Sequence, residues 1–390
     1  MGGDWTLPGV QQIIVDFSER TIDNSIAGSF DVDATSVNWR IMDDMALRYS
    51  EQTAVKAPDL GDLFLPQVTT FSTGADPCDY RYRDVGRNPD VRRANCDAEG
   101  IPADFISTVV NATAAGKTGG NPNLINEVAD TVSTGLVYQP NWWDDVFFGS
   151  VQFAVDYIEI ELNDYVTSYS LTQNMNACYD YETYPNSQFC DSFTRDGEFQ
   201  VVDFATGLIN AGLIDFATYV WKADFAFDVA ELASWVSREN VAMDLGSMAV
   251  RWRATQEDFF ASADSGAAED LVSATGQFGN DEWFWDTAIE WYKGDWYVWV
   301  QGNSRSGGVI DAFRQYDDEY LGYDGNPIFE FDGYTSWNGG VGYSVNDDTT
   351  IRVNASNLLD YDGTEDDVFT PEADLLFYGR SVTASVNVRF

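Results

Sequence analysis

The sequence of 390 residues predicts an all-β fold, a transmembrane antiparallel β-barrel of about twelve strands. Three observations predict it. Apolar and polar residues alternate in segments of about ten residues, which is the length that a tilted strand needs to cross a bilayer. Short and long connections alternate along the chain, and aromatic residues gather beside the short ones. Such a barrel has short turns in the periplasm and long loops outside the cell.

The alternation is clearest in two consecutive segments, 283–291 and 296–300. In the first, Trp283, Trp285 and Ile289 share one face, and a turn at 293–295 then makes a hairpin. The other predicted strands, in chain order, are 13–17, 37–41, 45–49, 131–138, 146–162, 209–221, 242–252, 334–343, 351–355 and 381–390.

Two of these segments carry further detail. Within 146–162 the apolar parity changes, which predicts a β-bulge near Asp156 to Ile158. In the last segment Val382 and every second residue up to Phe390 are apolar, and the residues between them, up to Arg389, are polar. This row predicts a lipid-facing side on the final strand.

The short connections are predicted at one end of the strands and the long connections at the other. Short ones lie near Asp43, Asn141, Lys293 and Asp347. Long ones are predicted at 54–128, 163–206, 254–281, 304–327 and 358–378. The aromatic residues beside the short turns are Trp142, Trp143, Trp291, Tyr292, Trp296 and Tyr297. Together they predict an interfacial girdle, with core packing or carbohydrate stacking as the alternative for any single ring.

The composition is strongly acidic, with 64 Asp and Glu against 21 Lys and Arg and a net charge of −43. A nucleic-acid partner is excluded because counterion release needs a basic face. The acids are expected on the loops and on the lumen face, where a hydrated carboxylate surface suits a salty habitat. The sequence has no apolar run long enough for a transmembrane helix. Its start has no signal peptide, so we expect either a cytosolic protein or a missing N-terminus.

Four cysteines form two local pairs in long polar segments, Cys78 with Cys96 and Cys178 with Cys190. Local pairs in loops favour disulfides made outside the cytoplasm. Zinc is the alternative, but the chain has no histidine and neither pair has zinc-knuckle spacing. The acidic run at 360–367 is similar to a calcium loop but lacks the glutamate at its twelfth position. No metal site and no cofactor are therefore predicted.

Six segments, in the same order along the chain, resemble landmarks of one family. They are LRYSEQTAVKAPDLGDLFLPQ (47–67), GGNPNLINEVADTVSTGLVYQP (119–140), VDYIEIELND (155–164), YDGNPIFEF (323–331), IRVNASNLLD (351–360) and GRSVTASVNVRF (379–390). The family is that of the TonB-dependent outer-membrane receptors. Lys56 stands where the family usually has Arg, and Asn126 where it usually has Pro. These departures weaken any inference of substrate by analogy.

The resemblance implies a location in the bacterial outer membrane and a transport function without enzymatic chemistry. Residues 1–390 would form the C-terminal portion of a 22-stranded barrel, without the plug domain. The function implied is TonB-energised uptake of a scarce bulky solute, such as a siderophore complex, a cobalamin or an oligosaccharide. Partners implied are outer-membrane lipid and lipopolysaccharide, the β-barrel assembly machinery through the C-terminal strand and Phe390, and the TonB system through a plug absent here.

Solute contacts are expected in the loops that carry the cysteines. The candidates are Tyr80, Tyr82, Tyr179, Tyr181 and Tyr184, with Arg195 as an anion contact. The alternative is that these side chains pack the loops, since aromatic rings more often fill space than contact ligand.

The competing function is that of a secreted acidic protein that binds or hydrolyses carbohydrate. A hydrolase needs two carboxylates roughly 5 to 10 Å apart, and the sequence singles out no such pair. A soluble sandwich or propeller would carry polar residues on the outward face of most strands. A fragment of a barrel would instead leave open strand edges, so the isolated chain is expected to be unstable outside detergent or lipid.

Overall fold

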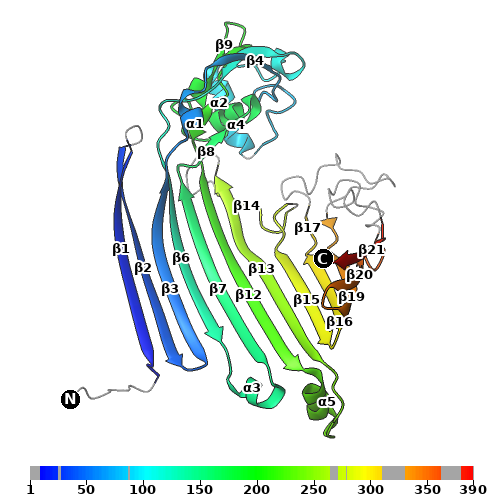
Figure 1. Ribbon diagram of the computed structural model, residues 1–390. Helices are drawn as coiled ribbons and strands as arrows, with labels where there is room; N and C mark the ends of the chain where they lie inside the picture. Colours follow the sequence, from blue (N-terminus) through cyan, green and yellow to red (C-terminus); the bar gives the residue numbers. More distant parts are fainter. Residues whose placement is uncertain are drawn as a thin grey trace, which may run out of the picture.

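The computed structural model describes residues 9–24, 28–86, 88–263, 271–277, 279–309, 330–361 and 379–389. Its main body is a curved antiparallel sheet in which consecutive long strands pair in chain order (Figure 1). The path is β1 (Gln12–Asn24), β2 (Gly28–Met42), β3 (Met45–Lys56), β6 (Glu127–Tyr138), β7 (Ser150–Asn163), β12 (Leu213–Asp228), β13 (Ser247–Ala263), β15 (Trp283–Lys293), β16 (Trp296–Arg305), β19 (Tyr334–Asn346), β20 (Thr349–Ser356) and β21 (Ser381–Val388). All twelve predicted strands are confirmed.

Smaller elements lie beside this path. β14 (Val272–Ser273) pairs with β13, and β17 (Gly308–Val309) pairs with β18 (Glu330–Phe331). None of the helices in the described ranges is both long and apolar enough to span a membrane.

The register places one apolar face along the whole sheet, because directly paired residues share a face. One row of paired residues runs Val151, Phe225, Val250, Ile289, Val300, Gly339, Ala355 and Val382. The adjacent row on the other face runs Gln152, Asp224, Arg251, Ala288, Gln301 and Asn338. An apolar outer face and a polar inner face are what a membrane barrel requires.

The expectation that the acids lie only on loops and the lumen face is wrong. The apolar face of β1 carries Val15 and Phe17, but the same face also carries Glu19 nearer the cap end. Further acids on this face are Asp33, Glu51, Asp130, Glu159, Glu161 and Asp215. The reason is strand length: β1 has 13 residues and β13 has 17, whereas about 9 to 11 suffice to cross the hydrocarbon core. The strands extend beyond it.

Strand extension also accounts for the parity change in β7. No bulge occurs at Asp156 to Ile158, because the pairing of β7 with both neighbours is continuous there. Phe153 and Val155 belong to the apolar band, and Glu159 lies on the same face above it. The irregularity in this part of the sheet is between β12 and β13, at Ala217 and Thr218.

The girdle prediction is half right. Trp291 and Trp296 lie on the apolar face, where Trp296 packs against Tyr343 with ring centroids 4.7 Å apart. Tyr292 and Tyr297 pair with each other on the polar face, at 4.8 Å. Adjacent residues of a strand point to opposite faces, so a run of aromatics beside a turn cannot all face lipid.

The asymmetry of the connections has two exceptions. β1 ends at Asn24 and β2 begins only four residues later at Gly28, at the end of the sheet with the long loops (Figure 1). The β12–β13 connection lies at the opposite end, which we call the turn end, and contains a helix, α5 (Val229–Ser237). In the described residues β1 pairs only with β2 and β21 only with β20, so the sheet has two open edges.

Candidate functional site

Two long connections fold together into a cap above the sheet, defined as residues 57–126 and 164–212 (Figure 1, top). Its elements are α1 (Leu60–Phe64), β4 (Val68–Ser72), α2 (Pro89–Glu99), η1 (Thr108–Val110), β5 (Ala114–Thr118), β8 (Val166–Ser168), α4 (Leu171–Tyr179), η2 (Cys190–Ser192), β9 (Phe193–Arg195), β10 (Val201–Phe204) and β11 (Leu208–Asn210). β8 pairs with β11 within the second connection. The two connections are joined by a parallel bridge between Lys117 and Ala205 and by hydrogen bonds from Thr108 to Gln200 and from Thr118 to Thr206.

Local sequence explains the two longer helices of the cap. α2 begins with Pro89 and ends at Gly100, which is left-handed with φ +88°. α4 begins with a capping box in which the hydroxyl of Ser170 accepts from the backbone N–H of Gln173. Both helices place a cysteine in the core of the cap.

The structure contains both predicted disulfides. Cys78 bonds Cys96 with Cα atoms 5.7 Å apart, and Cys178 bonds Cys190 at 4.9 Å. Each bond closes a loop within one connection, and Cys78, Cys96 and Cys178 are buried. The disulfides therefore constrain each connection separately and do not join the two.

Buried ion pairs join the two connections. Arg195 donates from Nη1 and Nη2 to the two carboxylate oxygens of Asp76, both at 2.8 Å. Arg92 donates to both oxygens of Asp180 at 2.5 and 2.6 Å. Ser107 donates a further 2.7 Å hydrogen bond to Asp76. Because buried charges are tolerated only when paired and hydrogen-bonded, these contacts fix how the two connections fit together.

Two further groups in the cap have perturbed acidity. Burial by itself would raise the pKa of Asp79, but hydrogen bonds from the Arg81 side chain and from the backbone N–H groups of Arg81 and Ser107 bring that pKa below its ordinary value. Burial first, and then the carboxylate of Glu99, raise the pKa of Tyr184 to about 12. The hydroxyls of both Tyr179 and Tyr184 donate to Glu99.

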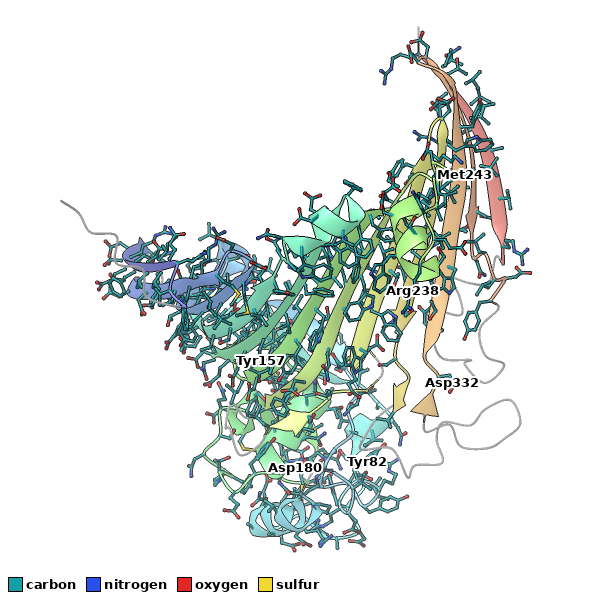
Figure 2. The ribbon with its side chains drawn as sticks, turned by 90° about the horizontal axis from the view of Figure 1, so that it is seen from below. Tyr82, Tyr157, Asp180, Arg238, Met243 and Asp332 are labelled. Atoms are coloured by element: carbon teal, nitrogen blue, oxygen red, sulfur yellow. A yellow bond between two sulfur atoms is a disulfide. The ribbon has the colours of Figure 1, made fainter. Side chains whose placement is uncertain are left out.

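The predicted contact residues divide into two groups. Tyr179 is 1% exposed and stacks on Tyr184, and Arg195 is occupied by Asp76. An anion therefore finds no free guanidinium at Arg195, and Tyr179, half-buried Tyr181 and Tyr184 pack the core of the cap. Tyr80 is 54% exposed and flanks Arg81, with half-buried Tyr82 on the other side of that guanidinium. Figure 2 labels Tyr82 and Asp180 in the cap.

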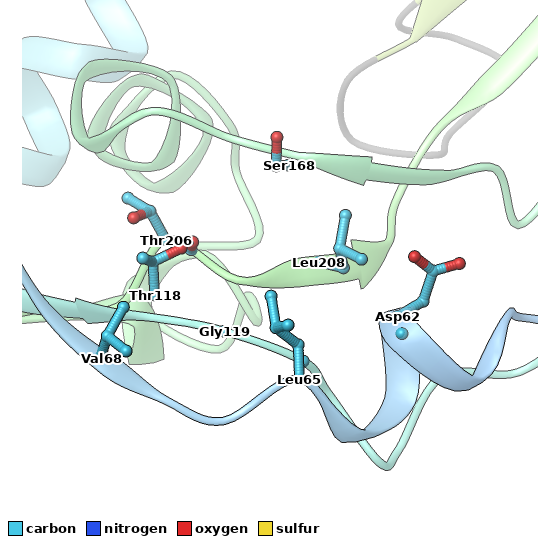
Figure 3. Close-up of a pocket in the computed structure, with 10 residues that line it drawn as sticks. Asp62, Leu65, Val68, Thr118, Gly119, Ser168, Thr206 and Leu208 are labelled. Atoms are coloured by element: carbon cyan, nitrogen blue, oxygen red, sulfur yellow. Dashed lines mark hydrogen bonds between the residues drawn. The ribbon is translucent and has the colours of Figure 1, made fainter.

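A cavity of 370 Å³ lies where α1, β4 and β5 meet β8 and β11 (Figure 3). Its lining is Gly61, Asp62, Leu65, Val68, Thr118, Gly119, Gly120, Ser168, Thr206 and Leu208. Asp62 is the only ionisable group among them, and it accepts from the backbone N–H of Asp59. The size is within the usual range of small-molecule sites. An uncharged group fits this lining best, since hydroxyls and backbone supply its polar contacts.

Sequence reasoning missed this cavity. Six of its ten lining residues come from five short elements, each contributing one or two, and the other four come from loops, and no spacing in the sequence joins them. In the described ranges no group of three or more His, Cys, Asp or Glu is arranged to hold a metal ion. Phe390 and residues 362–367 of the acidic run lie outside the described residues.

The polar face of the sheet is the second feature of interest. Arg48 pairs with Asp156 at 2.5 Å, Arg253 with Asp224 at 2.6 Å, and Arg251 with Glu290 at 2.6 Å. The last two pairs cross-link neighbouring strands on the inner face, and the first spans β6 to link β3 with β7.

Known proteins agree with this geometry. The family model described as "TonB dependent receptor-like, beta-barrel" matches residues 16–358. A mutant of the ferric enterobactin receptor PfeA of Pseudomonas aeruginosa in complex with enterobactin has a TM-score of 0.58 and 12% identity, covering 98% of this chain and 44% of that one. The siderophore receptor PirA of Acinetobacter baumannii has a TM-score of 0.56 and 12% identity, with 97% and 43% covered.

These likenesses establish the fold, and the chain spans less than half the length of those structures. No curated protein matches the sequence. The match to the family model covers most of the chain and agrees with the apolar outer face, the polar inner face and the capped loop end. The chain therefore belongs to the TonB-dependent receptor-like β-barrel family, whose members are receptors of the outer membrane and not enzymes.

Proposed function

We propose that residues 1–390 form the C-terminal part of the barrel of an outer-membrane receptor that takes up a scarce bulky solute. The open edges at β1 and β21 support the proposal that the chain is part of a larger barrel. All eight residues of β21 are exposed, and an unpaired edge of this kind is an aggregation hazard unless another strand covers it. Further strands of the complete receptor would supply that cover, as in a 22-stranded barrel.

Uptake in this proposal depends on a plug domain that the TonB system moves. The cap makes first contact with the solute, because it lies at the end of the sheet with the long loops, above β3, β6, β7 and β12. Lipid and lipopolysaccharide surround the apolar face, and the β-barrel assembly machinery reads the last strand, including Phe390.

The charges of the cap narrow the class of solute. Each arginine that the structure describes in the cap has a carboxylate partner: Arg81 with Asp79, Arg83 with Asp97, Arg92 with Asp180, Arg93 with Asp84 and Asp90, and Arg195 with Asp76. Lys117, on β5, is the remaining Lys or Arg among the described cap residues and has no ion pair. A strongly anionic chelate would need several cations that are not already paired. We therefore propose a bulky solute of low negative charge, such as a cobalamin, an oligosaccharide or an uncharged siderophore complex.

The contacts for such a solute would be the exposed ring of Tyr80, the neighbouring ring of Tyr82 and the hydroxyl-bearing cavity beside α1. Aromatic rings offer apolar area with few rotatable bonds, which limits the entropy lost on binding. The ordered cap limits it further, because its disulfides already constrain both connections.

The test is uptake by cells that carry the complete receptor. We expect accumulation of one radiolabelled solute from a panel of siderophore complexes, cobalamins and oligosaccharides, abolished when the TonB system is deleted. Tyr80→Ala should raise the half-saturating concentration, while Tyr165→Ala, an exposed tyrosine outside this site, should not. Energy-independent accumulation, or none for any solute, would refute the transport proposal.

The carbohydrate-binding or hydrolysing alternative has no support in the sheet. A soluble β protein would not carry the apolar row from Val151 to Val382 on its outward face.

A further inference from the structure

Two short helices at the turn end form an aromatic surface that the sequence did not predict. α3 (Trp142–Phe147) precedes β7, and α5 (Val229–Ser237) follows β12 (Figure 1). The rings of Phe147 and Trp235 meet edge to face with centroids 5.9 Å apart. Because α3 and α5 also contact β12, the two helices form one unit, which we call the helix pair.

The helix pair is attached on the apolar side of the sheet. The ring of Trp143 lies 5.9 Å from that of Phe225, and its indole N–H donates to the carbonyl of Ala226 at 3.0 Å. Phe225 belongs to the apolar row with Val151 and Val250, and its ring meets Phe153 at 5.3 Å. An aromatic chain therefore runs without interruption from the lipid-facing strands into the helix pair.

A second contact holds the α5 connection on the same side. The indole N–H of Trp291, on the apolar face of β15, donates to the carbonyl of Leu245 at 2.9 Å. Leu245 lies in the segment that returns from α5 to β13, so both ends of this connection are tied to the lipid-facing side.

The helix pair leaves large apolar side chains of α5 exposed. In α5 the hydroxyl of Ser234 accepts from the backbone N–H of Val241 at 2.9 Å, so the segment after the helix packs on the side that carries Ser234. Trp235 is left 65% exposed and Val236 68% exposed. Met243 and Phe148 are also exposed on this unit, and Figure 2 labels Met243 and Arg238 at this end.

We propose that the helix pair is an interfacial anchor that inserts Trp235 and Val236 into the headgroup boundary of the periplasmic leaflet. The molecule that covers this surface is phospholipid, because the surface continues the lipid-facing band of the sheet. Tryptophan, the residue most suited to the headgroup boundary, lies at the end of that band. The charged residues on it or beside it are Asp144 and Asp145 on α3, Asp228 and Glu231 at the start of α5, and Arg238, Glu239 and Asp244 after α5, with a negative sum. Insertion is therefore hydrophobic and suits a zwitterionic lipid such as phosphatidylethanolamine.

The chain allows a direct test, since its four cysteines are all in disulfides. The single variants Trp235→Cys and Met243→Cys are each labelled with an environment-sensitive fluorophore. They are then reconstituted in phosphatidylethanolamine-rich vesicles that contain nitroxide lipids. A label on Val300→Cys, in the middle of the apolar band, reports whether the chain is inserted in the bilayer, and only inserted preparations are compared. Asp43→Cys, at the exposed β2–β3 turn of the same end, is the aqueous control.

We expect shallow nitroxides to quench the labels at 235 and 243 at least about twofold more than the label at 43, as the depth of an interfacial helix predicts. Deep nitroxides should quench the label at 300 most. Two results would overturn the proposal. In one, aqueous iodide quenches the label at 235 as strongly as that at 43. In the other, the label is shielded from both lipid and aqueous quenchers, which would mean that a protein covers the surface.

Discussion

Arg48 on β3 and Asp156 on β7 form a 2.5 Å ion pair that spans the strand between them. That strand is β6, and the residue beneath the pair is Gly135, whose register partners are Arg48 on one side and Asp156 on the other. The pair is possible because Gly135 has no side chain. Three neighbouring strands are thus linked on the inner face by one contact that the backbone ladder does not provide.

Gly135→Ala should break this pair. A Cβ at Gly135 would overlap the Asp156 carboxylate and lie 2.9 Å from Nε of Arg48, so both side chains must move. We expect a loss of about 1–3 kcal/mol, as for an overpacked site. Unfolding by denaturant in lipid vesicles measures it. Gly342→Ala is the matched control, since its Cβ on the same face would meet nothing closer than 3.7 Å. Equal effects of the two substitutions would contradict the role of the pair.

A charge should be costly at one residue of β16 and tolerated at the next. Val300 lies in the apolar row and Gln301 in the polar row. Val300→Arg should lose about 2–4 kcal/mol in lipid vesicles, because a charge is costly near the bilayer midplane, while Gln301→Arg should change little. Unfolding by denaturant in lipid vesicles measures the free energy of unfolding of both variants. If Gln301→Arg were the more damaging of the two, the assignment of the faces would be reversed.

The sequence was sufficient for the strands because a membrane barrel imposes alternation on each of them. It was less accurate for their ends. The prediction of 242–252 begins before β13 (Ser247–Ala263) and stops eleven residues short of its end. The apolar signal ends where β13 leaves the bilayer, but hydrogen bonding to β12 continues to Ala263. The α5 helix was missed since its nine apolar-rich residues follow directly on a strand of similar composition.

The cap could be predicted only in outline. Cysteine spacing indicated the disulfides, because each bond is local in sequence. Asp76 and Arg195 are 119 residues apart, and neither lies in a pattern that marks it as buried. The sequence therefore predicts Arg195 as an anion contact without any sign of its pairing with Asp76. Long-range pairing of this kind has no local signature.

Removing one partner of that ion pair should destabilise the cap. Asp76→Asn leaves the buried guanidinium of Arg195 with only the more distant carboxylate of Glu99, 4.0 Å from its Nε, and breaking a buried pair typically costs about 3–5 kcal/mol. Hydrogen exchange of the cap backbone measures the loss, and strands such as β15 should keep their protection. Asp90→Asn, which removes a partner of Arg93 at the surface, is the control and should cost under about 1 kcal/mol. Similar exchange in the two variants would show that the Asp76–Arg195 pair does not hold the cap together.

Acid should loosen the cap through Asp79. Its carboxylate is fully buried and accepts from the backbone N–H of Ser107 at 2.8 Å and from Nη2 of Arg81 at 2.8 Å. Because the pKa of Asp79 is lower in the folded cap than the value of about 3.9 for an unperturbed aspartate, its contribution to stability is present in full above that value. The contribution is lost as the pH falls from there through the folded pKa.

Hydrogen exchange or proteolysis by an acid-active protease between pH 5 and pH 2 should therefore show the cap opening before the sheet. Asp79→Asn should weaken the cap at neutral pH and flatten this part of the profile. A wild-type cap that stays as protected at pH 2 as at pH 5 would mean that protonation of Asp79 does not limit its stability.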